Sequence, residues 1–295
     1  MVKKVFVYPY FKQENLVLGD KAKGILELDM LGFPVPCALI VSGSLYNKYS
    51  QKNDVHVREG IIEDIIEQIC RHFSSPKKVL VSLRCGHKSK KDAPKIFPTS
   101  VLNLGLDQTY YKEALESKMS DKKFLDILRN NCTKHAYEFF KFIGEQMPHK
   151  FASCSLDDQM RVLIRCLFAY FLKLESQYSK ELDTTIVIQK MVFGNVSNDS
   201  LTGMCYTRHP YSGEVMDYGV FIPCRQGMSL GGIHSNEQKD LSEMRDLSPN
   251  AYVQLKMICS ALEEFYRDIR CLEFTVQKGE LYILQNTVGN RTFRI

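Results

Sequence analysis

Cys271-Leu-Glu-Phe-Thr-Val-Gln-Lys-Gly-Glu-Leu-Tyr-Ile-Leu-Gln285 is the stretch that decides the predicted fold of this chain. Two alternating apolar runs, 272–276 and 281–284, flank Lys278-Gly279, and this pattern predicts a β-hairpin. Glu273 lies on the first strand and Gln285 ends the second, so strand pairing would bring a carboxylate beside an amide. Oxygen ligands of these two kinds suit Mg²⁺, which takes few protein ligands together with substrate phosphates. The hairpin therefore predicts a metal-nucleotide site.

The bulk composition is that of an ordinary globular protein. The 295 residues are 44% hydrophobic and 25% charged, and no apolar run approaches the roughly 18 residues of a membrane span. The start of the chain, 1–8, is too short for a signal-peptide core and is expected to be the first strand. The ten cysteines are scattered without CxxC spacing, so we expect no structural zinc. With no export signal and no long apolar run, we expect reduced thiols, a cytoplasmic location and no membrane partner.

The net charge of +5 is mild, but one stretch is strongly basic. A solvated loop and an attraction for phosphate are both open interpretations of it. A nucleic-acid-binding protein is a third and less favoured hypothesis, because no interleaved aromatic residues or finger motif accompany the charge. The basic residues are Lys77, Lys78, Arg84, Lys88, Lys90, Lys91 and Lys95.

Hydrophobic periodicity predicts an α+β protein. Helices are expected over 21–31, 60–73, 124–147, 156–178 and 249–267. Strands are expected over 1–8, 39–41, 79–83, 185–193, 203–207 and 218–222, followed by the hairpin. We expect an N-terminal lobe over 1–110, a helical subdomain over 111–180 and a C-terminal lobe over 181–295.

Four local motifs are candidates for chemistry, each with a structural alternative. Lys21 opens a helix after Gly19, where a cation and backbone amides can meet phosphate, although many surface lysines start helices. Arg84 follows a buried strand and can form a phosphate fork. The strand end at 192–195 can offer main-chain groups to a planar base or be a plain strand end. His209, before Pro210, is a phosphate acceptor, a ligand or a structural residue.

The order of these motifs resembles the N-terminal nucleotide-binding domain of the pyruvate phosphate dikinase and phosphoenolpyruvate synthase family, with the dikinase closer. The resemblance spans nearly the whole chain. It is carried by Gly19-Asp-Lys21, Leu31-Gly-Phe-Pro-Val-Pro36, Val81-Ser-Leu-Arg84-Cys-Gly86, Val101-Leu-Asn-Leu-Gly-Leu106, Gln189-Lys-Met-Val-Phe-Gly-Asn195, Thr202-Gly203, Thr207-Arg-His-Pro210, Leu272-Glu-Phe-Thr275 and Leu284-Gln285.

The resemblance implies an ATP-grasp fold, in which two lobes hold ATP between them, and phosphoryl transfer from ATP to a histidine on a separate swivelling domain. Lys21 and Arg84 would be catalytic and would contact the ATP phosphates. Glu273 and Gln285 would bind ATP and its Mg²⁺. The remaining ATP-binding residues implied are Thr99, Gln189, Met191 and Val192, of which the last three would line the adenine pocket.

The chain also departs from the family pattern. The loop 87–100 is basic and lacks the glycines that the family uses to cover phosphate. Cys271 stands for an aspartate, Val220 for a glutamate and Thr287 for an arginine, and Gln226-Gly-Met-Ser229 replaces Gln-Gly-Glu-Asp. Loss of one preorganised contact to the transition state costs about 2.7–4 kcal/mol, so several losses would abolish transfer while leaving nucleotide affinity.

Two functions therefore stay open. The first is a stand-alone Mg-ATP-binding phosphotransferase domain that phosphorylates a histidine on a separate phosphohistidine-domain protein. The second is a degenerate, non-catalytic nucleotide-binding or regulatory module. The family's phosphohistidine and barrel domains are expected to be absent from this chain.

Overall fold

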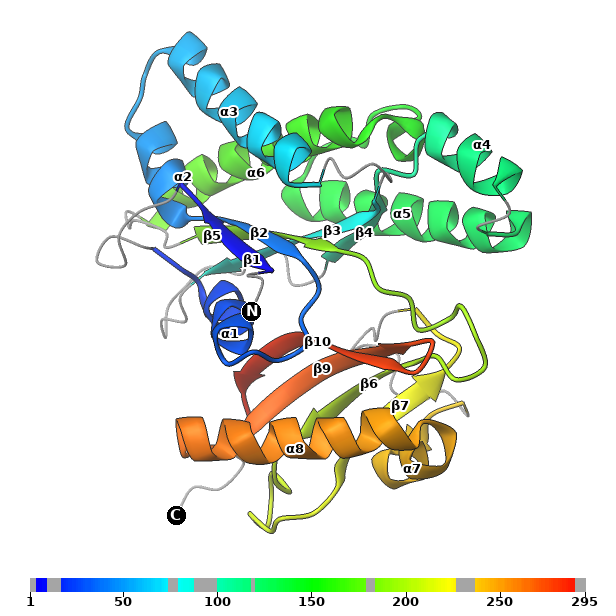
Figure 1. The fold of residues 1–295 in the computed structure, drawn as a ribbon. Helices are drawn as coiled ribbons and strands as arrows, with labels where there is room; N and C mark the ends of the chain where they lie inside the picture. Colours follow the sequence, from blue (N-terminus) through cyan, green and yellow to red (C-terminus); the bar gives the residue numbers. More distant parts are fainter. Residues whose placement is uncertain are drawn as a thin grey trace. The chain divides into compact units, whose positions relative to one another are not determined.

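The computed structural model describes residues 4–9, 17–73, 79–87, 100–117, 120–178, 184–226 and 237–289, and these form two five-stranded sheets with helices (Figure 1). The predicted α+β class is confirmed. The chain divides into two compact units. We call them the first-sheet unit, Val5–Ala22 with Cys37–Met191, and the second-sheet unit, Met1–Lys4 and Lys23–Pro36 with Val192–Ile295. The expected lobe boundaries near 110 and 180 stay a prediction.

The first-sheet unit is built on strands in the order β1-β2-β5-β3-β4. Only the β1–β2 pair is parallel, and the other pairs are antiparallel. The strands are β1 (Val5–Tyr8), β2 (Ala38–Val41), β3 (Val81–His87), β4 (Ser100–Leu104) and β5 (Thr184–Lys190). The helices are α2 (Gly43–Ser50), α3 (Val55–Phe73), α4 (Gln108–Glu116), α5 (Lys122–Ile143) and α6 (Leu156–Tyr178), with a 3₁₀ turn at Phe151–Ser153.

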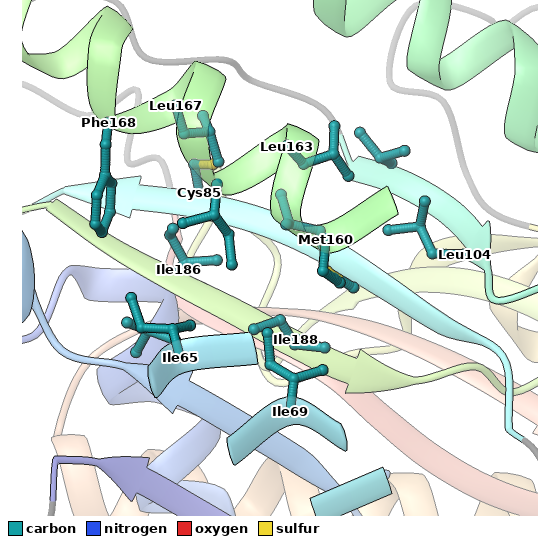
Figure 2. Packing of buried hydrophobic residues seen from close by; sticks show 14 of the residues in the cluster. Ile65, Ile69, Cys85, Leu104, Met160, Leu163, Leu167, Phe168, Ile186 and Ile188 are labelled. Carbon is teal, nitrogen blue, oxygen red and sulfur yellow. The ribbon is translucent and has the colours of Figure 1, made fainter. Parts of the chain in front are cut away.

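One face of the first sheet forms the main hydrophobic core against the helices. Alternate residues of a strand point to the same face, and on this face Leu83, Cys85, Ile186 and Ile188 are at most 2% exposed. Figure 2 shows Cys85, Ile186 and Ile188 meeting the apolar stripes of α3 and α6. The apolar helical stripes predicted from the sequence are therefore packing surface. The helices of this core cover one face of the sheet, and the candidate site residues of these strands lie on the opposite face.

Capping residues explain where the helices differ from the predicted ranges. Helix α3 begins five residues earlier than expected, because the Asp54 carboxylate accepts the backbone N–H of His56 at 2.8 Å. Helix α5 ends at Ile143, four residues early, since Gly144 adopts a left-handed φ of 80° and Glu145 N–H donates to the Phe140 carbonyl at 2.8 Å. The expected strand 185–193 ends at Lys190.

The second-sheet unit has an antiparallel sheet in the order β10-β9-β6-β7-β8. Its long helix α8 (Pro249–Tyr266) runs along one face of this sheet (Figure 1). The strands are β6 (Leu201–Tyr206), β7 (Tyr218–Pro223), β8 (Lys239–Asp240), β9 (Arg270–Gln277) and β10 (Glu280–Val288). The unit also contains α7 (Met244–Leu247) and a 3₁₀ turn at Leu241–Glu243. The predicted hairpin is confirmed, and positive φ angles at Lys278 and Gly279 form its turn.

Helix α1 (Asp20–Met30) packs directly on β10 through Gly24. A Cβ atom at Gly24 would lie within 3.0 Å of the Asn286 carbonyl oxygen, a backbone atom that cannot turn away. We therefore expect Gly24→Ala to lower the free energy of unfolding by about 1–3 kcal/mol, although alanine favours helices. A Cβ atom at Gly60 in α3 would have no neighbouring atom within 4 Å. Gly60→Ala should therefore raise the free energy of unfolding by about 0.5–1 kcal/mol.

Chemical denaturation of both variants measures this difference. A Gly24→Ala variant as stable as Gly60→Ala would contradict the close approach of α1 to β10.

Across the described ranges, no helix is both long and apolar enough to cross a membrane. All ten cysteines lie within those ranges, and none of them is in a disulfide there.

Candidate functional site

Glu273 and Gln285 lie directly opposite each other on β9 and β10. The register runs from Ile283 paired with Phe274 to Gln285 paired with Glu273, so Leu284 is a bulge. Without the bulge, Gln285 would share the buried face of Leu281 and Ile283, because side chains alternate along a strand. The extra residue turns Gln285 to the face of Glu273. The predicted juxtaposition of carboxylate and amide is thus present, and a bulge creates it.

The sheet face that carries this pair differs from the face under α8. Under α8, Leu272, Phe274 and Ile283 are fully buried. On the opposite face, Glu273 and Gln285 are half-buried, as are their neighbours. One row across the strands reads Val220, Met204, Glu273, Gln285, and the next reads Tyr218, Tyr206, Cys271, Thr287. Each of Val220, Cys271 and Thr287, the three departures from the family pattern in this region, therefore lies on the face of Glu273.

Burial raises the pKa of the thiol and of the phenol that lie beside the Glu273–Gln285 pair. Desolvation raises the pKa of Cys271 to about 11, although the Tyr206 hydroxyl that hydrogen-bonds to it acts in the opposite direction. Burial also raises the pKa of Tyr206 to about 12, with a contribution from Cys271. Both groups are neutral at pH 7. Within the described residues, no group of three or more His, Cys, Asp or Glu side chains is arranged to hold a metal ion.

A buried polar network beside Gln285 was not predicted from the sequence. Arg270 donates from Nε to the Asn286 side-chain oxygen at 2.8 Å, and the Asn286 amide donates to the Tyr266 hydroxyl at 3.1 Å. The Tyr266 hydroxyl in turn donates to Glu27 of α1, and the Arg270 guanidinium lies 4.1 Å from the Tyr266 ring centroid. This network and Gly24 fix α1 on β10. The one signal in the sequence was an isolated glycine within a helical pattern.

The first-sheet unit brings Arg84 and Gln189 to one face of its sheet. Arg84 pairs with Val187, and Ser82, two residues before it, pairs with Gln189. The pairing places all four on the face opposite the helical core. Arg84 is only 8% exposed, which is uncommon for an arginine.

Lys21 joins this face through Gly86. A Cβ built on Gly86 would point at the Lys21 side chain, 3.5 Å from its Cβ atom. Gly86 lies two residues after Arg84 and so shares its face. The residue before α1 is fixed to β5, because the Gly19 N–H donates to the Thr185 hydroxyl at 2.6 Å. Burial raises the pKa of Cys85 on the opposite face to about 12, and the nearby Lys21 charge acts in the opposite direction.

Gln189 carries a buried donor that lacks a hydrogen-bond partner within the described residues. The residue is 2% exposed, and its Nε2 atom has no hydrogen-bond partner in the described part of the chain. Buried donors are satisfied in the great majority of cases, so this one is a candidate to hydrogen-bond a ligand. At the end of β5, Lys190 and the following Met191 donate their N–H groups to the carbonyls of Cys37 and Leu80, each at 2.8 Å.

Met191 ends the first-sheet unit, and Val192 begins the second-sheet unit. Within the second-sheet unit, the Phe193 N–H donates to the Gln277 side-chain oxygen at 2.7 Å. The predicted site residues therefore fall into two groups, one in each unit. Thr99 lies outside the described residues, as do most of the basic loop 87–100 and the positions 227–229.

His209 closes the turn between β6 and β7. Its Nδ1 accepts the Ser212 backbone N–H at 3.0 Å, and its ring stacks edge-on against Tyr218 with centroids 4.6 Å apart. A backbone N–H can only donate, so Nδ1 is the acceptor in this contact and is used within the turn. This geometry favours the structural role of His209 over that of a phosphate acceptor.

The fold and these residues define a two-sheet α+β protein with buried or half-buried cations and amides on one sheet and a carboxylate–amide pair on the other. No family model matches the chain. Its curated relatives are pyruvate, phosphate dikinases, which confirms the resemblance and is consistent with an N-terminal domain of that family.

The chloroplastic pyruvate, phosphate dikinase of Mesembryanthemum crystallinum is 27% identical over 99% of this chain and 36% of its own length. The enzyme of Rhizobium meliloti is 26% identical over 93% of this chain and 37% of its own length. The chain thus spans little more than a third of these relatives. Among solved structures, C-terminally truncated Cdc123 from Schizosaccharomyces pombe has 10% identity and a TM-score of 0.42, covering 95% of this chain and 87% of that one.

Proposed function

We propose that this chain is an ATP-grasp domain of the dikinase type that binds ATP with Mg²⁺. The observation that carries the proposal is the register of Glu273 opposite Gln285 across the bulge. A bulge that turns one amide toward one carboxylate is a local departure from regular pairing, and bulges of this kind gather at functional sites. The dikinase relatives extend over nearly the whole chain and supply the nucleotide as the ligand.

Mg²⁺ fits the residues on this face of the second sheet. One carboxylate and one amide oxygen, both half-buried, match the few oxygen ligands that Mg²⁺ takes from a protein beside water and substrate phosphates. Glu273 and Gln285 would be the protein ligands. When bound there, the ion would supply positive charge that offsets the negative charge of the phosphates.

Lys21 and Arg84 would bind the phosphates of the nucleotide. Arg84 presents a planar fork suited to two phosphate oxygens, and Lys21 adds a compact charge from the first turn of α1. Because Arg84 is 8% exposed, its interactions are screened less by solvent than those of a surface arginine.

Gln189 would donate its buried Nε2–H to the adenine or the sugar of the nucleotide. We therefore expect Gln189→Met, which keeps the volume and removes the unsatisfied donor, to leave the apoprotein as stable or raise its stability by about 1 kcal/mol. The same change should shrink the rise in Tm that Mg-ATP produces, since a ligand stabilises in proportion to the logarithm of its affinity.

Gln159 is the matched control. It is fully buried, accepts the Gly105 N–H at 2.8 Å and donates to the Phe151 carbonyl at 2.9 Å. Gln159→Met should lower the free energy of unfolding by about 1–3 kcal/mol and leave the affinity for Mg-ATP unchanged. Thermal unfolding with and without Mg-ATP measures both. A wild-type protein whose Tm does not respond to millimolar Mg-ATP would overturn the proposal.

Phosphoryl transfer to a histidine on a separate protein is the catalytic form of this function, and retention of Lys21 and Arg84 supports it. A non-catalytic nucleotide-binding module is the second candidate, and the apolar or neutral Val220, Cys271 and Thr287 around Glu273 favour it. Release or transfer of the labelled γ-phosphate that is lost in Lys21→Ala would support the first. Saturable Mg-ATP binding without turnover would support the second.

A further inference from the structure

The side of α8 that faces away from its sheet carries an exposed apolar stripe. The helix buries Leu255 and Leu262 against the sheet, but Val253 is 57%, Met257 68% and Phe265 54% exposed. Residues four apart on a helix are neighbours, and every fourth residue from 249 to 265 is apolar. We call these residues the α8 stripe, and they are Pro249, Val253, Met257, Ala261 and Phe265.

Charge is nearly absent along this part of α8. Between 249 and 262 the one charged residue is Lys256, whose ammonium forms an ion pair with Asp217 of the same unit. A helix that lies on a lipid surface carries several lysines and arginines on its polar face, so these residues do not favour a membrane. An exposed apolar surface on a helix without such cations is typical of a contact between proteins.

The α8 stripe matches itself when the helix is reversed. It is symmetric about Met257, so an antiparallel copy would set Met257 against Met257. The same arrangement would set the larger Val253 against the small Ala261. Helices pack through rows of residues four apart, and the closest contact falls at the centre of the row because the row winds around the helix.

The charges at the two ends of α8 are complementary in the same arrangement. Asp246 precedes the helix and Arg267 follows it, and both are exposed. An antiparallel copy brings the end with the carboxylate of one chain to the end with the guanidinium of the other. Two-fold symmetry makes this pairing occur twice.

We propose that a second copy of this chain docks on the α8 stripe, helix against helix and antiparallel, to form a closed dimer. A contact centred on one helix pair is smaller than the roughly 800 Å² per partner of a standard interface, so we expect a Kd of about 10–100 µM. The stripe lies on the opposite side of the second sheet from Glu273, and dimer formation should therefore not depend on Mg-ATP.

Sedimentation equilibrium of the reduced full chain, without nucleotide, measures the dimer from well below to well above that Kd. Reductant keeps the exposed Cys224 from cross-linking chains. Met257→Lys should weaken the dimer by about 10-fold or more, because it removes the central apolar contact and brings two ammonium groups together. Met30→Lys is the matched control: Met30 is 64% exposed on α1, and its change should alter the Kd by no more than about 2-fold.

A charge exchange tests the antiparallel arrangement. Asp246→Arg and Arg267→Asp should each weaken the dimer by about 3-fold or more, since each places like charges together twice. The double variant should recover a Kd within about 3-fold of the wild type, because the opposite charges then meet again with their places exchanged.

A chain that stays monomeric at the highest concentration would overturn the proposal and leave the α8 stripe to a different protein. A dimer that Met257→Lys does not weaken would also overturn it. A double variant weaker than both single variants would contradict the antiparallel pairing.

Discussion

Replacing Glu273 with glutamine should lower the affinity for Mg-ATP by about 100-fold, or about 2.8 kcal/mol at about 1.4 kcal/mol for each tenfold change. The substitution keeps the shape of the side chain and its place opposite Gln285, but it removes the one negative charge in the two central rows of this face. Affinity for ATP without Mg²⁺ should change little, because the carboxylate acts through the ion. Calorimetric titration at fixed Mg²⁺ measures the effect.

Glu280 is the matched control for this variant. It lies on the same strand as Gln285, pairs with Gln277 near the hairpin turn, and is exposed. Glu280→Gln makes the same change in net charge and should leave the affinity for Mg-ATP within a factor of about 2, since exposed charges contribute little at this range. An equal loss in both variants would show that overall charge, and not a site at Glu273, governs binding.

Replacing Arg84 with methionine should also lower the affinity for Mg-ATP by about 100-fold. Each hydrogen bond to a charged group contributes about 1.5–3 kcal/mol, and a guanidinium can supply two to phosphate. Methionine keeps much of the apolar stem of this buried side chain, so the sheet face that includes Val187 is expected to fold. Arg84→Lys, which restores the charge without the fork, should recover about 10-fold of the loss.

Lys190 provides the control for charge on the same sheet. It is an exposed cation at the end of β5, beside Gln189. Lys190→Ala should leave Mg-ATP affinity nearly unchanged. If Arg84→Met bound Mg-ATP as tightly as Lys190→Ala, the assignment of Arg84 to the phosphates would be wrong.

The sequence allowed the elements of the fold to be predicted wherever periodicity was strong. The isoleucine stripe of α3 and the alternating runs around Lys278-Gly279 each have one structural solution, because a shifted register would expose the apolar side chains. Glu273 and Gln285 were predicted to meet because hairpin pairing is local. The bulge at Leu284 was not predicted, since nothing in the letters of 281–285 distinguishes a regular strand from one with an extra residue.

Long-range packing accounts for the rest of what the sequence did not reveal. The close approach of Gly24 to Asn286 and the hydrogen bond from Tyr266 to Glu27 each join residues more than 230 positions apart. The unsatisfied amide of Gln189 becomes visible only when β2, β3 and β5 are assembled. Arg84 was a candidate from its place after a strand, but its burial on the face that also carries Lys21 required the structure.

Binding of Mg-ATP to this chain is tested most directly by calorimetric titration of the full chain with ATP in the presence of Mg²⁺. We expect saturable binding of one nucleotide per chain at submillimolar concentration, which weakens when Mg²⁺ is withheld. No measurable binding at millimolar Mg-ATP would contradict it.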